Sequence, residues 1–159
     1  MNLKDEGGEC SIWKTLSLYS GSSYFLVSFL LKPDSINHES LMNRLVEEKA
    51  QSVPLVLREL KEPQYDSFVE IAVRTIHRTG INCASEIIEI IKAGNNRKVY
   101  AISTMCILLG FQDNSHSEKL LWDYYHYMKD SYPSNKYSDG PLLGLMEMWE
   151  RRKERASQN

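Results

Sequence analysis

Histidine and cysteine are the residues of this chain best suited to metal binding or nucleophilic catalysis. They are His38, His77, His116, His126, Cys10, Cys83 and Cys106. No HExxH or CxxC pattern joins them, and the GxSxG nucleophile motif does not occur. His116 and His126 are ten residues apart and could share a helix face, but two histidines alone are not a ligand set. We expect surface histidines and buried, hydrophobic cysteines rather than reactive thiols.

Nucleotide binding and acid–base catalysis have equally little support. Neither GxGxxG nor GxxxxGK[ST] occurs in the sequence. Glu47 and Glu48, or Asp66 and Glu70 one helical turn apart, could form a pair of catalytic carboxylates. A solvated helix face with ordinary i,i+4 contacts explains the same spacing. The sequence therefore predicts no catalytic residue, no metal and no cofactor.

An aromatic cluster runs from Trp122 to Tyr127. Successive residues of a helix point about 100° apart, so these rings cannot all enter one core. We expect Trp122, His126 and Tyr127 at the margins of the buried stripe or outside it. Tyr and Trp are favoured at protein interfaces. Two interpretations stay open: the rings pack on the terminal helix, or they form a binding surface.

A basic excess lies in the middle of the chain. The formal net charge is −2, but residues 49–111 carry a net +2 between two acidic ends. Arg74 and Arg78 are one turn apart, and Arg97 and Lys98 open the next comparable helix. Stacked helices would join these four cations into a patch suited to an acidic peptide or a phosphate. The alternative is a mixed surface with interspersed glutamates.

Helices must position these residues. Apolar residues between 64 and 78 recur at i, i+3, i+4, i+7, i+8 and i+11, which predicts an amphipathic helix. Gly80 follows as its C-cap, and Asn82 can cap the next helix. Residues 96–109 carry apolar residues on most sides, which predicts a central helix that ends at Gly110.

Capping signals predict the remaining helices. Asn37 and Ser52 can each cap a helix, the second beginning at Pro54. The pair Ser115 and Glu118 forms a capping box. Residues 139–141 (Asp-Gly-Pro) start the last helix. Its expected buried stripe is Leu142, Leu145, Met146 and Trp149.

The helices repeat along the chain. Residues 56–61 resemble residues 87–92 at an offset of 31, and residues 69–80 align with residues 99–110 at an offset of 30. A third, more divergent unit would pair residues 118–129 with residues 142–152. Such pairs bury a continuous core only when neighbours stack.

The sequences Val53-Pro-Leu-Val-Leu-Arg-Glu-Leu60 and Phe68 to Gly80 resemble HEAT repeats, with an early proline in the first helix and a terminal glycine in the second. The resemblance implies an all-α fold, a short right-handed α–α superhelix of about three to four stacked antiparallel helix pairs. We expect a capping segment at 1–36, the array at 37–156 and a disordered tail at 157–159. The offset is shorter than the usual HEAT period of about 40 residues.

HEAT-like arrays bind partners on the face of their second helices. The resemblance therefore implies a non-catalytic protein-interaction module for a protein or peptide partner, acidic if the basic patch contacts it. The candidate binding residues are Arg74, Arg78, Arg97, Lys98, Trp122, His126 and Tyr127. The alternatives are a HEAT-like enzyme such as an alkyl-base DNA glycosylase, or a small inhibitor or immunity-type protein.

Composition limits these alternatives. The net negative charge argues against nucleic-acid binding, which depends on phosphate contacts. The longest apolar run, residues 24–31, is far shorter than the ~20 residues needed to span a bilayer. The N-terminus is acidic, unlike that of a signal peptide. We expect a cytoplasmic protein that does not enter a membrane.

Overall fold

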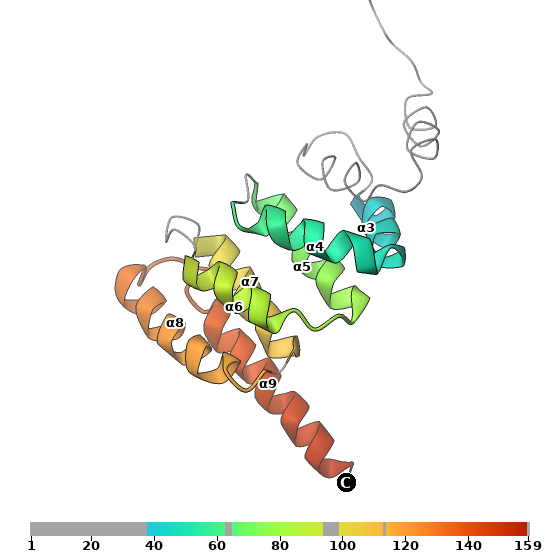
Figure 1. Cartoon of the computed structure of the whole chain (residues 1–159). Coiled ribbons are helices and arrows are strands. Elements are labelled where there is room, and N and C mark those ends of the chain that lie inside the picture. Colours follow the sequence, from blue (N-terminus) through green and yellow to red (C-terminus); the bar gives the residue numbers. More distant parts are fainter. Residues whose placement is uncertain (1–37, 63–64, 94–98, 113, 159) are drawn as a thin grey trace, which may run out of the picture.

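The computed structural model describes residues 38–62, 65–93, 99–112 and 114–158, which form helices and no strand. The helices are α3 (His38–Glu47), α4 (Lys49–Leu60), α5 (Asp66–Thr79), α6 (Ala84–Ala93), α7 (Val99–Gln112), α8 (Ser117–Ser131) and α9 (Gly140–Ser157) (Figure 1). The prediction of an all-α chain is confirmed over these residues. None of these helices combines the length and the apolar character needed to cross a membrane. The expected capping segment at 1–36, the Asn37 cap, Arg97 and Lys98 lie outside the described residues.

The helices pack in two rows. Helix α4 contacts α6, and α6 contacts α8, while α3, α5, α7 and α9 contact one another in succession. Each helix of the first row also packs on the helix that follows it in the chain (Figure 1). Helix α7 touches α5, α6, α8 and α9, and nine of its residues are buried. The expectation of a central, buried helix here is confirmed.

Two predicted helix ends are found in the structure. Gly80 follows α5 with φ 68°, in the left-handed conformation that glycine adopts without strain. Asn82 caps α6, because its Oδ1 accepts a hydrogen bond of 3.0 Å from the backbone N–H of Ala84. Both signals act locally, so they do not depend on how the helices pack.

The predicted start of α4 is wrong. Helix α4 begins at Lys49, so Ser52 and Pro54 lie inside it. The Ser52 hydroxyl donates a hydrogen bond of 2.5 Å to the carbonyl of Leu45 on α3, and Ser52 is fully buried. A serine that joins two helices has the same local sequence pattern as a serine that caps one.

The predicted boundary between α7 and α8 is also wrong. Helix α7 continues through Gly110 to Gln112, and α8 begins at Ser117. Asn114, not Ser115, accepts the hydrogen bond from the N–H of His116, at 2.9 Å. Glu118 is therefore not part of a capping box.

Glycines bring α7 and α9 close together. A Cβ built on Gly110 would overlap the carbonyl of Gly144, and one built on Gly144 would overlap the carbonyl of Cys106. Helix α9 starts at Gly140 with a proline in its first turn, as predicted. Its buried side carries Gly144, Leu145 and Met148. The expected burial of Met146 is wrong, because its side chain is 51% exposed.

Candidate functional site

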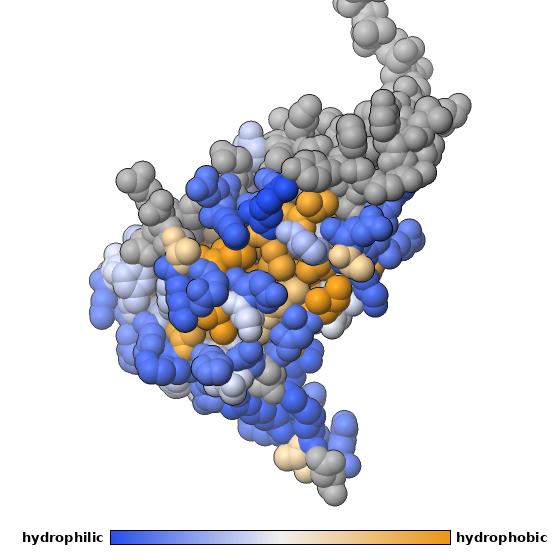
Figure 2. All heavy atoms as spheres, in the orientation of Figure 1, coloured by the Kyte–Doolittle hydropathy of each residue, from blue (hydrophilic) through white to orange (hydrophobic). Residues whose placement is uncertain are grey.

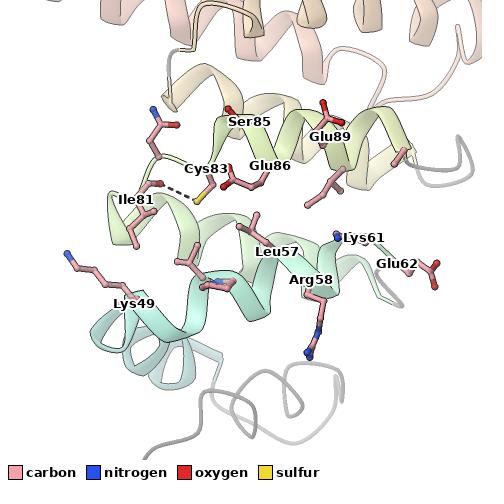
Figure 3. Close-up of a pocket in the computed structure, with 16 residues that line it drawn as sticks. Lys49, Leu57, Arg58, Lys61, Glu62, Ile81, Cys83, Ser85, Glu86 and Glu89 are labelled. Atoms are coloured by element: carbon pink, nitrogen blue, oxygen red, sulfur yellow. Dashed lines mark hydrogen bonds between the residues drawn. The ribbon is translucent and has the colours of Figure 1, made fainter.

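A groove with a volume of about 1030 Å³ runs between α4 and α6 (Figure 3). Helix α4 contributes Val53 and Leu57 at i,i+4 spacing, Lys61 follows directly after the helix, and α6 contributes Glu86 and Ile90 at the same spacing. One face of each helix therefore lines the groove. Other apolar side chains of α4, Val56 and Leu60, point into the core and are fully buried. Leu57 and Glu86 project into the space between the helices (Figure 3).

The groove is apolar at its centre and charged along its edges. Figure 2 shows a hydrophobic area on this side of the molecule, surrounded by hydrophilic side chains. On the α4 side the charged lining residues are Lys49, Arg58, Lys61 and Glu62, and on α6 they are Glu86 and Glu89. The α4 wall therefore carries a net positive charge and the α6 wall a net negative one.

Cys83 is the thiol at one end of the groove. It is only 2% exposed, and its Sγ lies 3.6 Å from the carbonyl oxygen of Ile81, to which it donates. Burial, helped by the negative charge of Glu86, raises the pKa of the Cys83 thiol to about 11. The thiol is protonated at neutral pH, so it is a poor nucleophile. Among the residues that the structure describes, no three His, Cys, Asp or Glu side chains are placed to hold a metal ion.

Ionisation of the buried thiols is expected to destabilise the protein in alkaline solution. Burial raises the pKa of both Cys83 and Cys106 above the usual 9.0. The unfolded chain therefore loses these protons at lower pH than the folded protein. The contribution to stability is complete below pH 9 and is lost as the pH rises through about 11. Urea unfolding between pH 7 and pH 11 should show a falling free energy of unfolding.

A Cys83→Ala/Cys106→Ala variant provides the control for this titration. Its free energy of unfolding should fall less steeply above pH 9, because alanine has no proton to lose. Burial also raises the pKa of Tyr124. Ionisation of Tyr124 therefore accounts for part of the fall in the free energy of unfolding that remains in the variant. An identical slope in the variant and the wild type would show that the thiols do not cause the loss.

The two arginines of the predicted basic patch are both ion-paired. Arg74 lies 2.5 Å from Glu70 on the same helix. Arg78 lies 2.7 Å from Glu39 on α3 and donates a hydrogen bond of 3.3 Å to Asn43. The positive charges of these arginines are therefore balanced by neighbouring carboxylates.

Arg74 also lines a second hollow, of about 470 Å³, on the face of the second helices. Helices α5 and α7 and the start of α9 form its walls, with Tyr100, Phe111 and Leu143 among the lining residues. Leu143 is 49% exposed at this site. The hollow has less than half the volume of the α4–α6 groove.

The predicted aromatic residues of α8 lie at or outside the margin of its buried stripe, as expected. They form two separate clusters. Trp122 is 37% exposed, stacks on His126 at 5.9 Å between ring centroids, and lies 6.0 Å from Trp149 of α9. Tyr127 packs elsewhere, 6.0 Å from Tyr124. The packing of Trp122 on the terminal helix agrees with the first interpretation, and the binding surface stays a prediction.

Glu118 fixes the contact between α8 and α9. Its carboxylate accepts a hydrogen bond of 3.2 Å from Nε1 of Trp149 and pairs with Arg152 at 2.5 Å. The indole N–H of Trp149 is therefore used within the fold. Trp122 and His126 remain as the exposed rings.

The groove was not predicted from the sequence. The apolar residues of 53–60 cover more than one helix face. Five of these eight residues are Val or Leu, more than a single core-facing stripe requires. That excess is the signal from which a second apolar face could have been inferred.

Comparison of the chain with models of protein families, with curated proteins and with solved structures gave no match. The proposal for its function therefore depends on the geometry of the chain itself.

Proposed function

We propose that this chain is a non-catalytic protein-interaction module that holds an apolar segment of a partner protein in the α4–α6 groove. The observation that carries the proposal is the groove itself, about 1030 Å³ with an apolar centre between charged walls. Ligand sites are typically mostly apolar, with a few polar groups that set orientation. Two helices that leave an elongated groove between them suit a helical segment.

The proposed architecture is a short right-handed α–α superhelix of the HEAT type. It is supported by the succession of contacts from α4 to α6 to α8 and from α5 to α7 to α9. Each contact repeats after one helix pair, as in a stack in which a unit touches only its neighbours. In such a stack, the groove lies between the first helices of adjacent units.

Leucine substitutions on α4 test whether the groove binds a partner. Leu57 lines the groove and Leu55 does not, although both are half-buried against the same core. A Leu57→Glu variant should lose at least about tenfold in affinity, because a carboxylate would be buried in the apolar interface. Leu55→Glu, which costs similar folding stability, should bind as the wild type does. Quantitative affinity purification from the native host with each variant as bait measures the difference.

A second pair of variants avoids any risk to the core. Ala50 lines the groove, whereas the adjacent Gln51 does not, and both are exposed in the first turn of α4. Glutamate is well tolerated in a first turn, so Ala50→Glu and Gln51→Glu should fold equally well. We expect the Gln51→Glu variant to retain partner proteins that the Ala50→Glu variant loses. Retention of the same proteins by all four variants would reject the groove.

The hollow between α5 and α7 is a second candidate, because Leu143 is exposed beside it. This is the second-helix face that the HEAT resemblance implies. If it binds the partner, Leu143→Glu and the double variant Arg74→Ala/Arg78→Ala should weaken binding. Under our proposal these variants keep the partner, and Leu57→Glu loses it.

A further inference from the structure

Both walls of the groove carry charged side chains that form no ion pair with another described residue. Glu86 on α6 and Lys61 directly after α4 both line the groove and are both exposed. Among the described residues, neither forms an ion pair, whereas Glu89 lies 3.4 Å from Lys92. Lys49, at the other end of α4, also lines the groove without an ion pair to a described residue. With respect to the described residues, the α4 wall thus offers two unpaired cations, Lys49 and Lys61, the second next to Glu62 in the chain, and the α6 wall offers one unpaired carboxylate, Glu86.

We propose that the groove takes an amphipathic helix with an acidic edge and a basic edge, and that these edges set the direction in which the helix lies. This inference rests on the proposed function. The apolar stripe of the bound helix would face Leu57 and Ile90. Its acidic edge would lie along the α4 wall, towards Lys49 and Lys61, and its basic edge along the α6 wall, towards Glu86.

The dimensions of the walls fit a helix of about three turns. Helices α4 and α6 have 12 and 10 residues. At 1.5 Å per residue they extend for about 15 to 18 Å, which matches a partner helix of about 10 to 12 residues. Apolar burial supplies affinity but no direction. The direction in which the partner helix lies must therefore be set by the charges on the two walls of the groove.

Direction follows from a simple geometric relation. If a bound helix is turned end over end with its apolar stripe still in the groove, its two edges exchange walls. A helix with an acidic and a basic edge therefore gains favourable contacts in one direction and repulsive contacts in the other. A helix with two edges of the same sign meets one repulsive wall in either direction.

A displayed library tests this inference directly. The probe is a set of helical peptides of about 12 residues with a fixed apolar stripe and with Lys, Glu or Gln at the edge positions. Selection on the full-length chain should enrich peptides with opposite edges about tenfold over peptides with edges of the same sign. Selection on Glu86→Lys should instead enrich peptides with two acidic edges. Lys153→Glu, a charge reversal on α9 away from the groove, should not change the preference.

A spin label at the N-terminus of a selected peptide measures its direction. The label should broaden the methyl signals of Ile81 or of Ile90, which lie at opposite ends of the α6 side of the groove. Moving the acidic and basic residues to the opposite edges should transfer the broadening to the other isoleucine. Binding without any edge preference, or without this transfer, would overturn the inference and leave the groove as a binding site. A library that enriches no peptide, or peptides that bind Leu57→Glu equally well, would reject the groove as well.

Discussion

Replacing Gly144 with alanine is expected to lower the free energy of unfolding by about 1 to 3 kcal/mol. The new Cβ would overlap the carbonyl of Cys106 on α7 and come within 3.3 Å of Cδ2 of Leu121. Backbone atoms cannot move aside as a flexible side chain can, so α7 and α9 would have to separate. Helix propensity alone predicts the opposite sign, a gain of about 1 kcal/mol. Urea unfolding followed by circular dichroism measures the change.

Two other glycines provide the controls. Gly110→Ala should be comparably destabilising, because its Cβ would overlap the carbonyl of Gly144. The double variant should cost less than the sum, since helices that have already separated accommodate the second methyl group. At Gly80 a Cβ meets nothing within 4 Å, so Gly80→Ala should cost only the left-handed strain of about 1 to 2 kcal/mol. A stable Gly144→Ala variant would contradict the close approach of α7 and α9.

Truncation of Phe68 to alanine is expected to cost about 3 to 5 kcal/mol and to act locally. Phe68 lies on α5 and is fully buried. In a stacked array, each unit depends mainly on its neighbours, so one end can open while the other stays folded. Hydrogen exchange followed by mass spectrometry should show loss of protection in α3, α4 and α5. Protection should persist in α7 and α9, which make the most extensive contact in the structure.

The matching variant at the other end is Leu145→Ala. Leu145 is also fully buried, but it lies on α9. Its truncation should remove protection first from α8 and α9. Uniform loss of protection throughout the chain in both variants would indicate one cooperative domain and would reject the proposed array.

The helix ends that depend on local backbone interactions were predicted from the sequence. Gly80 and Asn82 act through the backbone next to them, and the structure contains both caps. The helix expected at 64–78 is α5, Asp66–Thr79, because its apolar spacing is regular and Gly80 directly after it ends the helix. These features would be the same in almost any tertiary packing.

Features that depend on a second helix were not predicted. Gly110 has the local pattern of a helix end, but its missing side chain makes room for α9. Met146 fits an apolar stripe, yet its side chain is exposed, and Gly144 lies on the buried side of α9. Glycine at a close helix contact carries no hydropathy signal, so periodicity misplaces the buried face.

The candidate site shows the same limit. Counting charges along the sequence left two interpretations open for Arg74 and Arg78, a basic patch or a mixed surface with interspersed glutamates. The structure pairs Arg78 with Glu39, which is 39 residues away in the sequence. Lys61 and Glu86, by contrast, lie on facing walls of the groove and pair with no residue that the structure describes. Which charges are free depends on tertiary neighbours, so a segment-by-segment charge count cannot identify them.

The most direct test of the α4–α6 groove is methyl NMR of the full-length chain, labelled at Ile, Leu and Val, during titration with a library-selected helical peptide. The account predicts that the largest shift changes occur at Leu57, Ile81 and Ile90, which line the groove. The methyl groups of Ile107 and Leu143, which line the hollow between α5 and α7, should change little. The largest changes at Ile107 and Leu143, with none at Leu57, would contradict the account and place binding on the face of the second helices.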